Sequence, residues 1–191
     1  YNTASGWSSL LHNTTGYSNT AYGHQSLYNN ISGESNTACG IDALNSNSTG
    51  GYNTAIGDHA LSAVTTGSYN VGLGQNAQVP NAAGIYQLRA GNTSIEYAGV
   101  QVPWTITSDR HWKANIQPTT LGLDFIEKLN PVSYYRTNDE KQKTEYGFIA
   151  QDVQKTLIEF GDTNNGIISA DDEGLLGMRY NDLFSPIVKE C

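Results

Sequence analysis

Small apolar residues alternate with Asn, Thr, Ser and Gly along the first 80 residues, in a pattern that returns every 17 positions. The motif Asn-Thr-Ala-X-Gly begins at Asn2, and a leucine follows it at a fixed distance in the first four copies. The unit lacks the 3.6-residue apolar period of a helix, whereas its Gly and Asn residues favour short strands joined by tight turns. We therefore predict an all-β solenoid or β-roll over residues 1–80. Its five 17-residue repeats begin at Asn2, Asn19, Asn36, Asn53 and, in degraded form, Asn70.

Each predicted coil carries few large apolar side chains and cannot bury a core alone. We expect several chains to share one core and predict a homotrimer. The repeat resembles the head repeats of trimeric autotransporter adhesins and the related repeats of phage and viral fibres, although its 17-residue step differs from the adhesin heads. The stalk is interpreted either as a rigid spacer or as a receptor-binding surface. The tyrosines that would stack on sugars, or else pack between coils, are Tyr17, Tyr22, Tyr28, Tyr52 and Tyr69.

Residues 81–107 lose the repeat and are predicted to form a β connector. An alternation of apolar and polar residues over 100–107 predicts a strand with one buried face. Pro103 would confine this strand to a sheet edge or a bulge, because proline has no N–H to donate. The apolar members of the alternation are Val100, Val102, Trp104 and Ile106.

Residues 108–191 carry helical and strand patterns typical of a small α+β domain. A helix is predicted from Thr119 or Thr120 to about Leu129, where Asn130-Pro131 ends it. A last helix is predicted from Asn181, with Pro186 tolerated in its first turn. Between them we expect strands at 132–136, 146–150 and 175–180, a short helix over 151–157 and a polar loop over 161–173.

Charge divides the chain near residue 107. The first 107 residues contain four acidic residues and one arginine, and nearly all the remaining charge follows. The net charge of −8 argues against nucleic acid as a partner, because an acidic surface repels a polyanion. Neither a membrane-spanning segment nor a signal peptide is visible, so no membrane partner is expected. Since the first residue is Tyr1 and not Met, we expect a fragment of a longer protein.

Four stretches, in this order, carry a resemblance to a known family: SDRHWKANI, DFIEKLNPVSYYR, YGFIAQDVQ and RYNDLFSPIVK. They look like the peptidase S74 family, the C-terminal intramolecular chaperone domain of phage endosialidases and tail fibres. The resemblance implies that residues 108–191 trimerise, drive folding of the upstream β-structured fibre and release themselves by autoproteolysis. It puts the family's serine on Ser108 and its lysine on Lys113, with the scissile bond at Thr107–Ser108. The family usually has arginine where His111 stands, and a long helical extension after the position of Cys191.

A serine hydroxyl is a poor nucleophile until a base removes its proton. Lysine acts as that base only when neutral, so its ordinary pKa of about 10.4 must fall, as happens on burial. We expect trimer assembly to bury Lys113, after which Ser108 attacks the Thr107 carbonyl and water resolves the ester. Nucleophile and target are neighbours in the chain, which favours their reaction. Whether Lys113 acts within its own chain or on a neighbour stays open, and an unassigned backbone N–H is the expected oxyanion donor.

Supporting roles in the site are assigned to Asp109, His111 and Asn115, with His111 expected to be structural. No cofactor and no metal site are expected. His12, His24 and His59 occupy different positions of the repeat and form no metal-binding ladder. The stretch 162–173 resembles a calcium loop only faintly, because its glycine is misplaced and flanking helices are not predicted.

The leading hypothesis is the C-terminal part of a trimeric phage or viral fibre or tailspike protein, located in the virion, with a self-cleaving chaperone that is afterwards released. Its expected external partner is a host-cell surface receptor or glycan, bound by the stalk or an upstream region. The alternative is a non-cleaving structural trimerisation cap of a surface adhesin or receptor-binding fibre. A polysaccharide-degrading enzyme is disfavoured, because the few carboxylates of residues 1–107 are scattered, and no activity on external substrates is expected.

Overall fold

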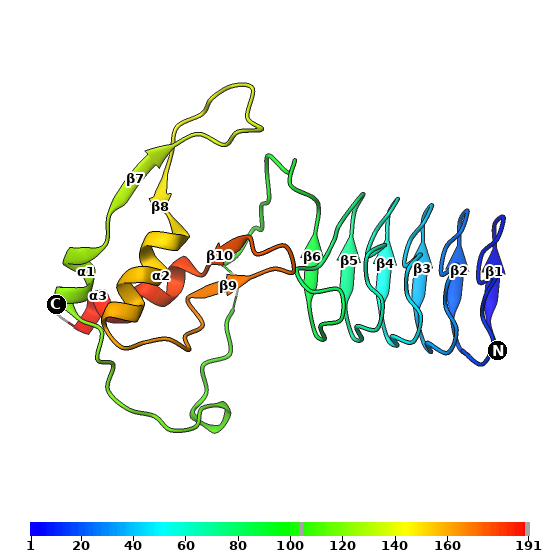
Figure 1. The fold of residues 1–191 in the computed structure, drawn as a ribbon, viewed down its shortest axis with the longest axis horizontal. Coiled ribbons are helices and arrows are strands. Elements are labelled where there is room, and N and C mark those ends of the chain that lie inside the picture. Colours follow the sequence, from blue (N-terminus) through cyan, green and yellow to red (C-terminus); the bar gives the residue numbers. More distant parts are fainter. Residues whose placement is uncertain (104, 190–191) are drawn as a thin grey trace. The chain divides into compact units, whose positions relative to one another are not determined.

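The computed structural model describes residues 1–103 and 105–189, and the chain divides into two compact units, residues 1–98 and 99–191 (Figure 1). Each unit has its own hydrophobic core. Trp104, assigned to the connector strand, and Cys191 lie outside the described residues.

The first unit is a parallel β-solenoid, in which each coil adds one three-residue strand to a single six-stranded sheet (Figure 1). The register pairs each residue with the one 17 positions later, as in Ala4 with Ala21 and Ala21 with Ala38. This arrangement confirms the predicted all-β solenoid, and the sheet continues past residue 80. Its strands are Thr3–Ser5 (β1), Thr20–Tyr22 (β2), Thr37–Cys39 (β3), Thr54–Ile56 (β4), Val71–Leu73 (β5) and Leu88–Ala90 (β6).

The solenoid core consists of small and medium side chains stacked in rows. The central alanine of β2, β3 and β4 faces inward, and Leu27, Leu44 and Leu61 are fully buried opposite this row. A single chain closes this core by itself, because alanine lets the walls of each coil approach closely. Burial of the core thus needs no other chain, and a core shared between chains stays a prediction. The homotrimer therefore stays a prediction that needs a different physical basis.

Buried asparagines join each coil to the next. The Asn19 carboxamide oxygen accepts hydrogen bonds from the backbone N–H and the Nδ2 of Asn36, at 3.0 and 3.1 Å. Asn36 Nδ2 also donates to the Gly50 carbonyl at 2.9 Å. Asn53 repeats these contacts one coil later. The ladder therefore satisfies polar groups that small apolar side chains cannot, and it does so only when asparagine lies on asparagine, which excludes shifts smaller than one repeat.

Several positions of each coil have a left-handed backbone, and glycine occupies only some of them. Gly40 has φ of +142°, and a Cβ there would overlap the Gly57 carbonyl of the next coil. The leucine row is also left-handed, with φ of 51°, 53° and 50° at Leu27, Leu44 and Leu61. A leucine in this region costs about 1–2 kcal/mol, and complete burial of its side chain offsets that cost.

The second unit combines short helices with two antiparallel hairpins around a core that contains Phe125, Val153 and Leu157. This confirms the predicted small α+β class. Asn130 and Pro131 end the first helix as predicted, and Pro186 lies in the first turn of the last helix. Its elements are Arg110–Trp112 (η1), Leu123–Lys128 (α1), Pro131–Tyr134 (β7), Glu145–Phe148 (β8), Ala150–Glu159 (α2), Ile168–Ala170 (β9), Leu176–Met178 (β10), Tyr180–Leu183 (η2) and Phe184–Lys189 (α3).

Three local predictions need correction. Helix α1 starts at Leu123 because Gly122, with φ of −146° and ψ of −149°, is not helical, and Thr119 instead accepts a hydrogen bond from the nearby Leu121 N–H. Part of the predicted loop 161–173 is strand β9, which pairs with β10. The predicted strand over 100–107 does not form in its described residues, because no neighbouring strand pairs with them and the apolar side chains remain exposed.

Asn36→Ala tests the asparagine ladder. The substitution removes the amide contacts to the coils on both sides and leaves the Asn53 backbone N–H without its described acceptor. We expect the free energy of unfolding of the solenoid to fall by about 2–4 kcal/mol, measured by chemical denaturation. Asn29→Ala is the control, since Asn29 is exposed, and we expect a change of about 0.5 kcal/mol or less. Equal effects of the two substitutions would contradict a dominant role for the buried ladder.

Candidate active site

A single tight turn organises residues 108–113. Asp109 is extended, and its side chain accepts a hydrogen bond from the His111 N–H at 2.8 Å, which caps the short helix η1. The Asp109 carbonyl accepts from the Trp112 N–H and the Arg110 carbonyl from the Lys113 N–H, each at 3.1 Å. The chain therefore reverses its direction between Ser108 and Lys113.

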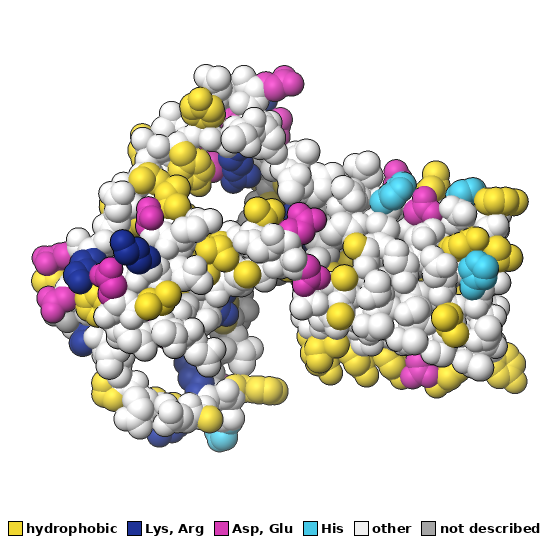
Figure 2. All heavy atoms as spheres, viewed as in Figure 1, with side chains coloured by type: hydrophobic (Ala, Val, Ile, Leu, Met, Phe, Trp, Pro, Cys, Tyr) yellow, Lys and Arg dark blue, Asp and Glu magenta, His cyan; other side chains and the backbone are white. Residues whose placement is uncertain are grey.

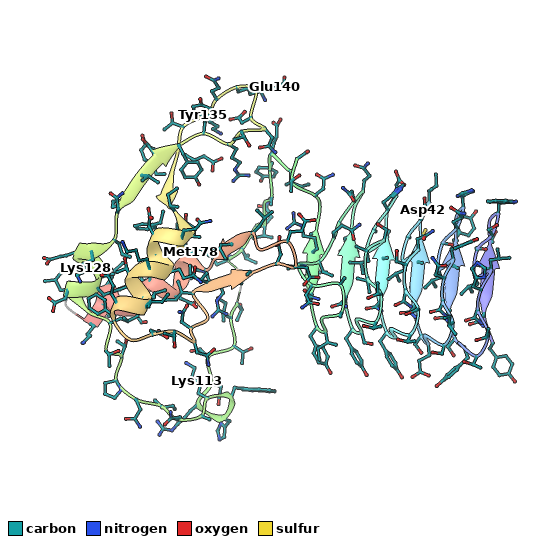
Figure 3. All side chains as sticks on the ribbon, viewed as in Figure 1. Asp42, Lys113, Lys128, Tyr135, Glu140 and Met178 are labelled. Atoms are coloured by element: carbon teal, nitrogen blue, oxygen red, sulfur yellow. The ribbon has the colours of Figure 1, made fainter. Side chains whose placement is uncertain are left out.

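The turn brings Lys113 to Ser108. Lys113 Nζ lies 2.7 Å from Ser108 Oγ, within hydrogen-bonding distance. In Figure 3 the labelled Lys113 lies on the loop that contains η1, outside the packed helices of its unit. A nucleophile and a proton acceptor at this separation have the geometry that general-base activation of a hydroxyl requires.

The site is open to water in the single chain. Every residue from 105 to 120 is exposed, including Thr107, Ser108 and Lys113. The side chain of Trp112 is 82% exposed although it is large and aromatic. The geometry of the pair is therefore present without the dry surroundings that favour a neutral lysine.

Asp109 and His111 form a second pair beside the first. His111 Nδ1 lies 2.6 Å from Asp109 Oδ1, the oxygen that also accepts from the His111 backbone N–H. These contacts, the backbone one first, lower the pKa of the Asp109 carboxyl. The His111 ring thus contacts Asp109, in keeping with a structural part for this histidine.

The remaining predicted site residues lie near the turn. Thr107 directly precedes Ser108, which leaves its carbonyl next to the hydroxyl oxygen in the chain. Asn115 follows the turn with φ of +50°, a conformation that asparagine tolerates better than most residues. A supporting role for Asn115 stays a prediction.

Other candidate chemistry is limited in the described part of the chain. Within residues 1–103 and 105–189, no group of three His, Cys, Asp or Glu side chains is arranged to hold a metal ion. His59 lies between Asp42 and Asp58 on the solenoid surface, while His24 stacks on Trp7. No helix among the described residues is long and apolar enough to cross a membrane.

Three tyrosines, Tyr52, Tyr69 and Tyr86, form a stack on the solenoid surface. The rings of Tyr52 and Tyr69 lie 4.8 Å apart and nearly parallel, and Tyr86 continues the stack at 4.9 Å. Glu34 accepts a hydrogen bond from the Tyr52 hydroxyl and raises the pKa of Tyr17 and Tyr52. Because these faces cover one another, the stack offers a sugar mainly ring edges and its two ends.

The second unit contains a hollow that the sequence did not predict. It has a volume of about 340 Å³ and is lined by side chains that include Tyr134, Phe148, Met178 and Tyr180. The Tyr180 hydroxyl accepts a hydrogen bond from the Phe148 N–H at 3.2 Å. The lining comes from segments far apart in sequence, so no local motif indicates it.

Comparison with known proteins identifies the region that contains this turn. Residues 108–162 match the model of the peptidase S74 family, described as the chaperone of endosialidase. The match begins at Ser108, and it confirms the resemblance carried by the sequence motifs. It implies self-cleaving peptidase activity in general terms. No curated protein and no solved structure gave a significant match.

Proposed function

We propose that the chain is the C-terminal part of a trimeric phage or viral fibre whose second unit is an intramolecular chaperone that cuts itself from the stalk at Thr107–Ser108. The observation that carries the proposal is the 2.7 Å contact between Lys113 Nζ and Ser108 Oγ, at the start of the family match. The parallel solenoid that precedes it fits a fibre stalk.

In the proposed reaction, Ser108 Oγ adds to the Thr107 carbonyl carbon as its proton passes to Lys113 Nζ. The C–N bond then breaks, and Lys113 returns the proton to the departing nitrogen of Ser108. The Thr107 acyl group is left as an ester on Ser108 Oγ. Water hydrolyses this ester to the Thr107 carboxylate and the free Ser108 hydroxyl, so the reaction is a single turnover that consumes its own peptide bond.

Assembly is the proposed trigger. A lysine that faces water is protonated and cannot accept the serine proton, whereas removal of water favours its neutral form. Ser108, Lys113 and the neighbouring Trp112 are exposed in the single chain. Packing against other copies would cover them, so that cleavage follows trimer formation and does not precede it.

The repetitive sequence of the solenoid explains why its folding would need a chaperone. Each strand pairs with a strand from the next repeat, and a shift by one repeat would pair almost the same residues again. Such degeneracy allows chains to combine in the wrong register, and non-local pairing is slow. A folded trimeric unit at one end would fix the register of three chains before they pair.

The solenoid surface supplies an apolar row for contact between copies. The third residue of each strand faces outward, and Tyr22, Ile56 and Leu73 in this row are 63%, 47% and 40% exposed. Figure 2 shows hydrophobic side chains on the solenoid surface, with few charges among them. A continuous exposed apolar row is typical of an interaction surface. A location in the virion and a receptor or glycan on the host surface belong to the same proposal.

Intact mass under denaturing conditions tests the cleavage. We expect wild-type protein to give two fragments, residues 1–107 and 108–191, and Ser108→Ala and Lys113→Ala to remain whole, because one lacks the nucleophile and the other the base. Uncut wild type that sediments as a trimer would instead support the non-cleaving trimerisation cap.

A trap for the acyl intermediate tests the route. Ser108→Cys should form a thioester at Thr107, and hydroxylamine should cut it faster than water does. The product should be fragment 1–107 with a hydroxamate at its C-terminus, identified by its mass. A variant that is cut at the same rate with and without hydroxylamine, and yields only the carboxylate, would contradict the acyl shift.

Ile56→Lys tests the contact between copies. A charge in the exposed row should prevent close approach, so the cleaved stalk fragment 1–107, expected to be a trimer in the wild type, should sediment as a monomer with unchanged circular dichroism. Thr66→Lys is the matched control, since it adds the same charge at an exposed position outside the row. A trimer that persists in Ile56→Lys would exclude this row as the interface.

A further inference from the structure

The pair Ser108–Lys113 depends on a turn that has little support of its own. The short helix η1 spans only Arg110–Trp112, and none of its residues is buried. A single turn of this kind fixes several backbone angles for very few hydrogen bonds and is marginal in water. Something must stabilise the chain reversal if Lys113 is to stay near Ser108.

Asp109 supplies that support in two ways. Its Oδ1 accepts from the His111 N–H at 2.8 Å, which satisfies one of the amides left unpaired at the start of a helical turn. The same oxygen lies 2.6 Å from Nδ1 of the His111 ring. The low pKa of the Asp109 carboxyl agrees with these contacts, since both favour the ionised form.

We propose that Asp109 is a positioning residue for the self-cleavage reaction: it caps the turn that holds Lys113 Nζ against Ser108 Oγ. This inference rests on the proposed function and adds a part for a residue that does not touch the reacting atoms. Asp109 acts through the backbone amide of His111, and the shape of the cap, not its charge, is what the reaction needs.

The neighbouring geometry favours a cap over a second base. The Asp109 oxygen with described contacts is engaged by His111, while the Ser108 hydroxyl is engaged by Lys113. The two hydrogen-bonded pairs are joined by the backbone bonds of the turn, from Trp112 to Asp109 and from Lys113 to Arg110. Loosening the cap therefore changes how often Lys113 reaches Ser108 without altering either reacting group.

Single-turnover cleavage of capping variants tests the proposal. Full-length protein is refolded from denaturant, and loss of the uncut chain is followed by denaturing gel and intact mass. The protein concentration is raised until the rate no longer depends on it, so that assembly does not limit the measurement. Asp109→Ala should cleave about 5–10-fold more slowly, the loss that a missing N-cap produces.

Rescue separates capping from charge. Serine and asparagine cap helical turns about as well as aspartate but carry no charge, so Asp109→Ser and Asp109→Asn should cleave within about twofold of wild type. Asp171→Ala is the matched control, because Asp171 Oδ1 also accepts the N–H two residues on, that of Glu173, but away from the site. This control should cleave like the wild type.

Each other outcome overturns the proposal. If Asp109→Ala cleaves like the wild type, the cap has no part in the reaction. If the serine and asparagine variants are as slow as the alanine variant, the carboxylate charge matters and capping does not explain it. In both cases a wild type that cleaves, beside an inert Lys113→Ala, leaves the proposed function standing. An uncut wild type overturns the proposed function and this inference together.

Discussion

The coil-to-coil register of the solenoid is the constraint on which the first unit depends. A buried asparagine amide in one coil is satisfied by the backbone and side chain of the asparagine 17 residues later, as Asn19 is by Asn36. The amide nitrogen also donates to a glycine carbonyl of its own coil, but the amide oxygen accepts from the next coil, so this part of the stability arises between neighbours and is lost when they separate. A second row of asparagines, Asn13, Asn30 and Asn47, shows where this stacking ends. Asn47 donates to Asn30, but Val64 occupies the next position of the row. The Asn47 carboxamide oxygen is consequently buried without a described partner.

A repetitive solenoid is stable once its coils are stacked, but the register of its strands is poorly determined while it folds. Strands β1 to β4 share the sequence Thr-Ala followed by one variable residue, so native and slipped pairings among them differ little in local free energy. The second unit has a different construction, with a compact core around Phe125 and Leu157 whose contacts do not repeat. Under the proposed function, the unit with a unique packing determines the register of the unit with a repetitive one. Later removal of the second unit leaves a stalk that cannot readily refold once it has unfolded, so its persistence depends on slow unfolding.

The fold could be predicted where the sequence pattern is periodic. It was less predictable where an element forms only through contact with a segment distant in the sequence. The 17-residue step determines strand, turn and register together, because each position must stack on its equivalent. The closed single-chain core was not foreseen, since it depends on how closely alanine lets the coil walls approach. Strand β9 depends on a partner, β10, that local sequence does not indicate, whereas residues 100–103 have the alternation of a strand and no described partner. The family motifs predicted Ser108 and Lys113 as the reacting residues. The short distance between their side chains could not be predicted, because it depends on the turn that Asp109 caps.

The locality of that turn bears on how cleavage is timed. Ser108 and Lys113 are joined by a few residues of one chain, so their approach does not require the solenoid, the hairpins or another copy. Proximity therefore cannot be what distinguishes an unassembled chain from an assembled one. Exposure can, because the whole segment 105–120 faces water in the single chain and lysine is a base only when it is kept from water. A pair that is always close but inactive until covered responds to assembly itself, which is the event that must precede loss of the chaperone.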